Sequence, residues 1–147
     1  LVLRDLEVLL AGPEQVTIGV SLSMLDDSTR RIVEPGASSI TERLDVLEKL
    51  HSSGIRTYVF IGPVLPHITD PEAIVAATAS VVDEVWGECL NLRCGNFEDI
   101  SRAYDTLQLP GDWGELARSE DYWTMVSNNL QKACLAARLP LVGFYRH

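Results

Sequence analysis

The sequence predicts an α/β fold in which parallel strands form part of a (βα) barrel. The first observation is that segments rich in β-branched residues alternate with segments of helical periodicity, which favours βαβ units. The second is the pattern of residues 16–23, where large apolar side chains alternate with small ones. The small face consists of Thr17, Gly19, Ser21 and Ser23. A barrel lumen that holds a ligand needs such a face, so the pattern favours a barrel. The alternative is a tightly packed flat sheet.

The first predicted elements are a helix and a strand. Residues 3–11 have the periodicity of an amphipathic helix, which a Gly-Pro pair at 12–13 ends. The strand over 16–23 follows, and a charged loop then runs to about Ala37. The chain opens on Leu1 rather than Met, inside this first predicted helix, so we expect it to be a fragment or a trimmed piece of a longer protein.

The second helix and the second strand have clear boundary signals. Ser39 and Glu42 have the spacing of a capping box, which predicts a helix start, and Gly54 is well placed just past the helix end. Residues 55–61 are rich in β-branched and aromatic residues and predict a strand. The Gly-Pro pair at 62–63 is expected to stop this strand.

The remaining elements continue the alternation of helix and strand. They are a helix over 71–82 with Asp70 as its N-cap, a strand over 84–93, a helix starting near Asn96 and Asp99, a loop over 110–114, a long helix over 115–138 and a strand over 141–145. We expect one domain over 1–147, with barrel units over 1–95 and the C-terminal helices and last strand over 96–147.

The composition limits the classes of function. The net charge is −9 with 12 Lys and Arg residues, so nucleic-acid binding by this chain alone is not expected. No apolar run has the length of a membrane span and no signal peptide is recognisable, which predicts a cytoplasmic protein without membrane contact. The three cysteines, Cys89, Cys94 and Cys134, fit no zinc motif, and no metal ligands are predicted.

One group of motifs resembles a known enzyme family. The strand that ends in Ser-x-Ser is followed by Glu34-Pro35, by Arg43 in the next helix and by the stretches "SSGI" and "GPVLPHITD". This set resembles the second half of a radical S-adenosylmethionine (SAM) enzyme, in the branch that includes spore photoproduct lyase. The resemblance covers residues 3 to about 93 well and the C-terminal third loosely.

The resemblance implies a partial (βα)₆ barrel, of which this chain would carry the fourth to sixth strands. The family's Cys-x₃-Cys-x₂-Cys loop, which holds a [4Fe–4S] cluster, belongs to the missing N-terminal half of the barrel. The spacing of Cys89 and Cys94 does not match that loop. The resemblance therefore places SAM and the cluster in the complete protein, and the isolated chain is expected to be inactive.

The family's cofactor wall has counterparts in this chain. By resemblance, Ser21 and Ser23 would contact the ribose or the carboxylate of SAM, and Arg43 would bind the carboxylate. Ile61 and Gly62 would contact the adenine. Structural alternatives remain: the serines could be small lumen fillers, and Arg43 could pair with Glu34 or with Asp26.

Substrate-binding candidates follow from the position of the strand ends. Ligands of parallel α/β folds bind at the carboxyl ends of the strands. His67 follows the second strand, Asn91 and Arg93 end the third, and Arg146 and His147 follow the fourth. We expect His67, Asn91 and Arg93 to bind substrate, although a surface position is the alternative for His67. No catalytic residue is assigned.

Three functions compete on this basis. The first is the C-terminal portion of a radical SAM lyase-like enzyme that uses 5′-deoxyadenosyl radical chemistry on an unknown substrate. The second is a non-catalytic half-barrel that assembles, for example as a homodimer, through exposed sheet edges. The third, an aldolase-like lyase, is weakened because no lysine lies near a strand end to form a Schiff base.

Overall fold

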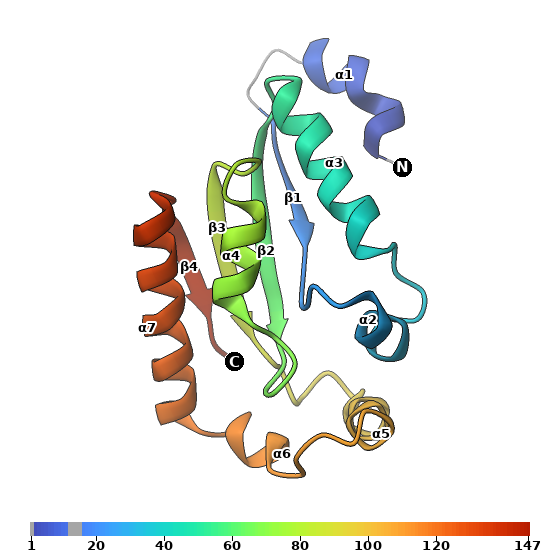
Figure 1. The fold of residues 1–147 in the computed structure, drawn as a ribbon, viewed down its shortest axis with the longest axis vertical. Helices are drawn as coiled ribbons and strands as arrows, with labels where there is room; N and C mark the ends of the chain where they lie inside the picture. The colour runs from blue at the N-terminus through green and yellow to red at the C-terminus, as the bar shows by residue number, and fades with distance from the viewer. Residues whose placement is uncertain (1, 12–15) are drawn as a thin grey trace.

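The core of the computed structural model, which describes residues 2–11 and 16–147, is a sheet of four parallel strands in the order β1-β2-β3-β4 (Figure 1). The strands are β1 (Thr17–Ser21), β2 (Arg56–Val64), β3 (Glu84–Cys89) and β4 (Leu141–Tyr145). Each strand therefore pairs with the next strand along the chain. The predicted α/β class and the parallel sheet are confirmed.

Within residues 2–11 and 16–147, eight helical segments connect or flank these strands. They are η1 (Val2–Asp5), α1 (Leu6–Ala11), α2 (Asp27–Val33), α3 (Ile40–Ser52), α4 (Pro71–Thr78), α5 (Phe97–Thr106), α6 (Trp113–Leu116) and α7 (Glu120–Ala137). Helices α3, α4 and α7 run alongside the strands, whereas α2, α5 and α6 lie beyond the strands' carboxyl ends (Figure 1). None of the helices in the described ranges is both long and apolar enough to cross a membrane.

In the part of the chain that the structure describes, helices cover one face of the sheet (Figure 1). Connections between parallel strands are right-handed. Each strand of this sheet lies on the same side of the strand before it, so every connecting helix lies on the same face of the sheet. The exposure of alternate residues agrees, since Val59 and Val85 are fully buried while Tyr58 and Trp86 on the same strands are only half-buried. The sheet thus has a helix-covered face and an open face.

The hydrophobic core fills the space between the covered face and the helices. Leu47 of α3, Ile74 of α4 and Leu130 of α7 are completely buried and pack in one cluster with Val59 and Val85. Their spacing along each helix is the amphipathic spacing that the sequence shows. The core therefore holds the strands in register and leaves the open face free of helix contacts.

The cap signals at two helices are confirmed. The Ser39 hydroxyl accepts a hydrogen bond from the Glu42 backbone N–H, and the Glu42 carboxylate accepts one from the Ser39 backbone, which completes the capping box of α3. Asp70 accepts a hydrogen bond from the backbone N–H of Ala73 at the start of α4. These short-range patterns placed both helix starts correctly.

Several predicted boundaries are wrong. The charged loop contains a helix, α2, whose N-cap Asp26 accepts hydrogen bonds from the backbone of Ser28 and Thr29. Strand β2 continues through the Gly62–Pro63 peptide, which is cis, to Val64.

Other elements are shorter than expected or divided. Strand β1 begins at Thr17 and ends at Ser21, and α4 ends at Thr78. Strand β3 ends at Cys89, so Asn91 and Arg93 lie in the turn beyond it. The long C-terminal helix is divided into α6 and α7, and the segment 3–11 comprises η1 and α1. The Gly-Pro pair at 12–13 lies outside the described residues.

Candidate functional site

The open face of the sheet carries a row of aromatic side chains. The rings of Tyr58 and Trp86 have centroids 5.8 Å apart, and Trp86 stacks on Tyr145 at 5.8 Å with an interplanar angle of 15°. Together with Thr17, Phe60 and Glu84 they line a hollow of about 370 Å³. The open face is therefore largely apolar and accessible in this chain.

The small face of β1 borders this aromatic row. Gly19 pairs with Tyr58 across β1 and β2, and a Cβ atom on Gly19 would overlap the Tyr58 ring. The glycine thus lets the ring lie across the neighbouring strand. Thr17 also lines the hollow, which places these two residues of the predicted lumen face on the open side of the sheet.

The two serines at the end of β1 have different surroundings. Ser21 is exposed, and its carbonyl oxygen accepts a hydrogen bond of 3.0 Å from Nη1 of Arg43. Ser23 is buried, and its hydroxyl donates to the carbonyl oxygen of Gly62 at 3.0 Å. Ser23 therefore joins the ends of β1 and β2, while Ser21 stays at the surface beside Arg43.

The guanidinium of Arg43 is bound on every side by the protein itself. Its Nε donates to the carbonyl of Ser38 at 3.1 Å, Nη1 donates to Ser21, and Nη2 forms an ion pair with Glu34. The pairing with Glu34 is one of the two structural alternatives that the sequence left open. A ligand carboxylate at Arg43 would have to take the place of Glu34.

The two residues expected at the adenine lie on opposite sides of the sheet. Ile61 is fully buried in the core cluster beneath the helices, so its side chain does not reach the open face. Gly62 is on the open side, where a Cβ atom would overlap the ring of Phe60. Gly62 faces the open side but is itself buried, so neither residue of this pair is exposed to a ligand on the open face.

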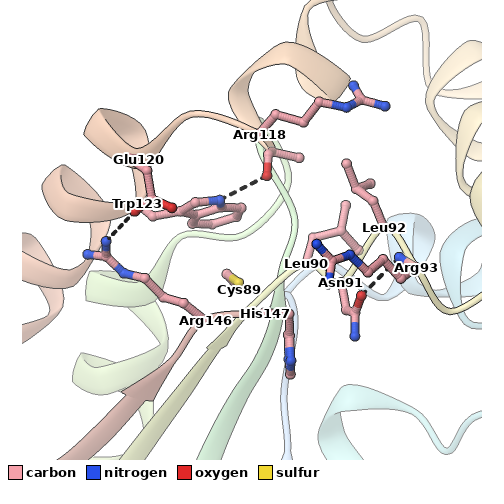
Figure 2. Close-up of a pocket in the computed structure, with 11 residues that line it drawn as sticks. Cys89, Leu90, Asn91, Leu92, Arg93, Arg118, Glu120, Trp123, Arg146 and His147 are labelled. Atoms are coloured by element: carbon pink, nitrogen blue, oxygen red, sulfur yellow. Dashed lines mark hydrogen bonds and ion pairs between the residues drawn. The ribbon is translucent and has the colours of Figure 1, made fainter.

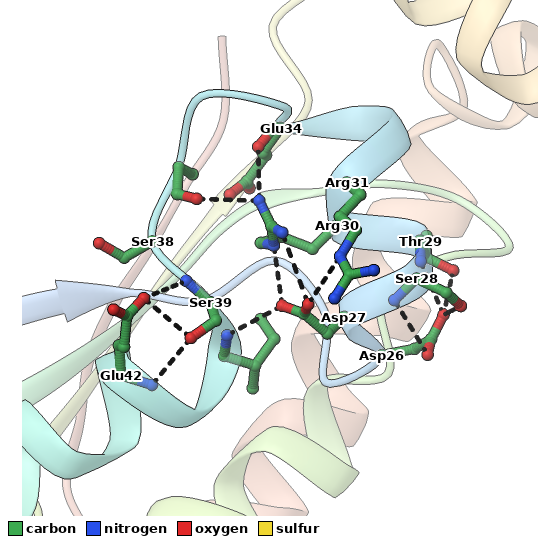
Figure 3. A network of polar contacts seen from close by, with 12 residues as sticks. Asp26, Asp27, Ser28, Thr29, Arg30, Arg31, Glu34, Ser38, Ser39 and Glu42 are labelled. Carbon is green, nitrogen blue, oxygen red and sulfur yellow. Dashed lines mark hydrogen bonds and ion pairs between the residues drawn. The ribbon is translucent and has the colours of Figure 1, made fainter.

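A polar network at the carboxyl end of β1 joins α2 to α3 (Figure 3). The Asp27 carboxylate accepts hydrogen bonds from Nε of Arg30 at 2.8 Å and from the backbone N–H of Ile40 at 3.2 Å. Nη1 of Arg30 in turn donates to the carbonyl of Ala37 at 2.8 Å. The hydrogen bond from Arg30 holds the pKa of Asp27 below its usual value. The charged linker therefore fixes the loop that follows β1.

His67 lies apart from the other substrate candidates. It follows β2 with a positive φ of 63°, and its Nε2 lies 2.7 Å from Oδ1 of Asp112 in the loop before α6. This contact ties two loops at the carboxyl end of the sheet. His67 is an exposed residue whose side chain is 28% exposed.

The other substrate candidates come together in a pocket at the carboxyl ends of β3 and β4 (Figure 2). Its volume is about 390 Å³. We call it the arginine pocket and define it by Asn91, Arg93, Arg118, Glu120, Arg146 and His147. Trp123 and the buried Cys89 also line it, and burial raises the pKa of the Cys89 thiol.

Hydrogen bonds position several groups of the arginine pocket. Nη1 of Arg146 lies 2.9 Å from Oε2 of Glu120, and Nε2 of His147 lies 2.7 Å from Oε1 of Glu88. Figure 2 shows Arg146 and Arg93 on opposite sides of the pocket.

The arginine pocket contains residues that the sequence did not single out for binding. Arg118 and Glu120 were expected inside one long helix, and Trp123 on its apolar stripe. The signal that could have found them is Ser119, which caps α7 by accepting a hydrogen bond from Tyr122. It marks the helix boundary that brings Arg118 and Glu120 to the strand ends.

Within residues 2–11 and 16–147, no group of three or more His, Cys, Asp or Glu side chains could hold a metal ion. Cys89 and Cys134 are buried and Cys94 is exposed, and all three are free thiols. Burial raises the pKa of Cys134 to about 11. The cysteines of this chain therefore do not fit the ligand set of an iron–sulfur cluster.

The chain is similar to several proteins that are described only as uncharacterized. It is 31% identical to protein MJ0683 of Methanocaldococcus jannaschii over 63% of this chain and 36% of that protein. It is 34% identical to protein ORF301 of Acidianus two-tailed virus over 68% of this chain and 36% of that protein. Protein Rv2578c of Mycobacterium tuberculosis is 33% identical over 46% of this chain and 20% of its own length.

The chain thus spans about a third of the length of the first two of these relatives. No family model matches it. No solved structure matches it either.

Proposed function

We propose that this chain is the C-terminal part of a radical SAM enzyme of the spore photoproduct lyase-like branch, with its open sheet face as the inner wall of a partial (βα)₆ barrel. The observation that carries the proposal is the one-sided sheet. Four parallel strands follow in sequential order, helices cover one face, and the uncovered face holds the small residues Thr17 and Gly19.

The strand order favours a barrel over a doubly wound sheet. A doubly wound sheet reverses its strand order at a switch point and carries helices on both faces. A barrel keeps the sequential order and carries its helices only outside. All-parallel sheets are almost always covered on both faces, so the aromatic row on the open face needs a covering layer. The missing N-terminal half of the barrel would supply it.

The residues of this chain fit SAM only in part, and they do not fit the cluster. Arg43 forms an ion pair with the carboxylate of Glu34. This pair supports carboxylate binding by Arg43, because the carboxylate of a ligand would replace a group of the same chemistry. Ser21 and Gly62 lie on the same side of the sheet. The cluster ligands would come from the rest of the protein. Bound to a reduced cluster, SAM supplies the 5′-deoxyadenosyl radical.

The test uses the complete protein, purified without oxygen and supplied with iron and sulfide. With dithionite and SAM, we expect 5′-deoxyadenosine to form, measured by liquid chromatography and mass spectrometry. Arg43→Gln should raise the KM for SAM at least about tenfold, because a charge-assisted hydrogen bond is lost. Arg31→Gln is the matched control, since Arg31 is 74% exposed and pairs with Asp27 at the surface of α2. No 5′-deoxyadenosine from protein with bound iron would refute the proposal.

The assembly module has one supporting observation. Within the described sheet, β1 and β4 each have an edge without a strand partner. Light scattering of the isolated chain tests the assembly module. A dimer, together with a complete protein that shows no SAM-dependent activity, would favour this function. A strict monomer would count against it.

A further inference from the structure

A histidine and a glutamate meet on the open face at the carboxyl ends of β3 and β4. Glu88 shares the open side of β3 with Trp86, and it pairs with Tyr145 of β4. Nε2 of His147, which follows β4, lies 2.7 Å from Oε1 of Glu88. Figure 2 shows the His147 ring turned away from the side chain of Arg146. The pair thus lies at the end of the sheet where parallel α/β folds bind their ligands.

The contact between Glu88 and His147 adds little to the fold. Strands β3 and β4 are already paired through their backbones at this position, and both side chains are partly exposed, where ion pairs contribute little. The other two histidines of the chain contact carboxylates from segments that no strand pairing joins: His67 with Asp112, and His51 with Asp83. Those contacts have a structural use that the pair on the open face lacks, which favours a chemical role for Glu88 and His147.

Each member of this pair keeps one polar atom for a ligand. On the same face of β3, Glu84 has both carboxylate oxygens bound, Oε1 by Arg56 and Oε2 by the indole N–H of Trp86. Among the described residues, Oε2 of Glu88 and Nδ1 of His147 have no hydrogen-bond partner. An ionised carboxylate only accepts hydrogen bonds, so Glu88 selects the imidazole tautomer with its proton on Nε2. Nδ1 is then a free base.

Aromatic rings border the pair. A Cβ atom on Gly62 would lie 3.1 Å from Cβ of Glu88 and 2.4 Å from the ring of Phe60, so the glycine lets Phe60 and Glu88 lie side by side. Phe60 and Tyr145, which pairs with Glu88, both line the hollow of about 370 Å³ on the open face. A flat apolar molecule stacked in this hollow would therefore lie next to the pair.

We propose that His147 is an acid–base residue that exchanges a proton with a flat, weakly acidic substrate on the open face, and that Glu88 is its positioning residue. Nδ1 of the neutral imidazole takes the proton of a polarised C–H, N–H or O–H bond, and the bonding electrons stay on the substrate. The imidazolium then returns the proton to the product or to water. The Glu88 carboxylate orients the ring and stabilises the imidazolium. That this substrate lies inside a barrel rests on the proposed function.

The test uses 5-nitrobenzisoxazole, a flat aromatic probe for a base beside an apolar surface. A base that removes its C3 proton forms the nitrile, breaks the N–O bond and releases a coloured cyanonitrophenolate. With the complete protein as purified and without SAM, we expect saturable release of this phenolate, measured by its absorbance. His147→Gln should lower kcat/KM at least about tenfold, because it removes the base.

The pH profile of Glu88→Gln tests the positioning role. Among the described residues, Glu88 is the charged group in contact with His147, since Arg146 is held by Glu120 and the β2 neighbours Phe60 and Gly62 are apolar. The neutral amide stabilises the imidazolium less than the carboxylate does, so the pH at which kcat/KM is half-maximal should fall by about one unit. An unchanged midpoint would refute the role of Glu88, because loss of structural support alone would not move it.

His51→Gln is the matched control, because His51 also lies near a carboxylate, Asp83 at 3.6 Å, but belongs to the last turn of α3. It should leave kcat/KM unchanged. Phenolate release no faster than in buffer, or an equal loss in His51→Gln and His147→Gln, would overturn the proposal. Such a failure would leave the 5′-deoxyadenosine experiment unaffected. Conversely, a protein that forms no 5′-deoxyadenosine would still release phenolate if His147 is the base, so the two failures are distinguishable.

Discussion

The contacts of Arg43 show which features of a binding group can be predicted from its residue type and which cannot. An arginine early in α3 suggests a carboxylate partner, and in the structure that carboxylate belongs to Glu34. The chemistry could be predicted because guanidinium and carboxylate are complementary. The sequence offered Glu34 and Asp26 as partners but could not choose between them, because the return of the loop to α3 depends on Asp27 and Arg30, which contact Ile40 and Ala37.

Asp27 gives a pH-dependent prediction at the scale of one side chain. Its folded-state pKa lies below the usual value near 3.8, chiefly because Arg30 donates a hydrogen bond to it. The stabilisation it provides is therefore present above about pH 4 and is lost as the pH falls through the folded-state pKa. We expect Asp27→Asn to lower the free energy of unfolding at pH 6 and to have a smaller effect at pH 3.

Urea unfolding at the two pH values measures this difference. Asp45→Asn is the control for the change in net charge, since Asp45 is an exposed carboxylate on α3. If Asp27→Asn destabilised the protein equally at pH 6 and pH 3, the network around Asp27 would not depend on its charge.

At the scale of helices and strands, local signals predicted starts better than lengths. The capping box of α3 and the Asp70 cap of α4 lie within four residues of chain, so their hydrogen bonds could be expected from spacing alone. The division between α6 and α7 was missed, because the apolar stripe of Trp123, Val126 and Leu130 suggested one continuous helix and Ser119 was not recognised as an N-cap. The seven-residue α2 was missed, although Asp26 caps it locally, because its sequence DSTRRIV is short and mostly polar and has no apolar stripe.

Helix α7 provides a matched pair of leucines for a stability prediction. Leu130 is fully buried against the covered face of the sheet, whereas Leu135 on the same helix is 67% exposed. Leu130→Ala should lower the free energy of unfolding by about 3 kcal/mol, the usual cost of a buried cavity. Leu135→Ala should change it by less than about 0.5 kcal/mol. Chemical denaturation checks both, and equal losses would mean that α7 does not pack as described.

At the scale of the whole molecule, the sequence predicted the parallel sheet and the small face of β1. It did not predict that Tyr58 would lie over Gly19, because that contact comes from the register between two strands. The arginine pocket was predicted only in part for a similar reason. Arg93, Arg118 and Arg146 come from three separate segments, and only the folded chain brings them together.

The solvent accessibility of the open face in the complete protein tests whether this sheet is one wall of a barrel. In the isolated chain the aromatic row is accessible, and Thr17 at the end of the hollow is exposed. If the rest of the protein closes a barrel, the same face becomes internal. If it does not, the face stays open to solvent in the complete protein as well.

The most direct measurement is the rate at which a polyethylene-glycol maleimide modifies Thr17→Cys in the complete protein. A Cys94→Ser background removes the exposed native thiol, and Glu48→Cys on the outer surface of α3 is the exposed control. The proposed barrel predicts that Thr17→Cys reacts at least about tenfold more slowly than Glu48→Cys, because a thiolate must be accessible to react. Equal rates at the two positions would contradict the barrel.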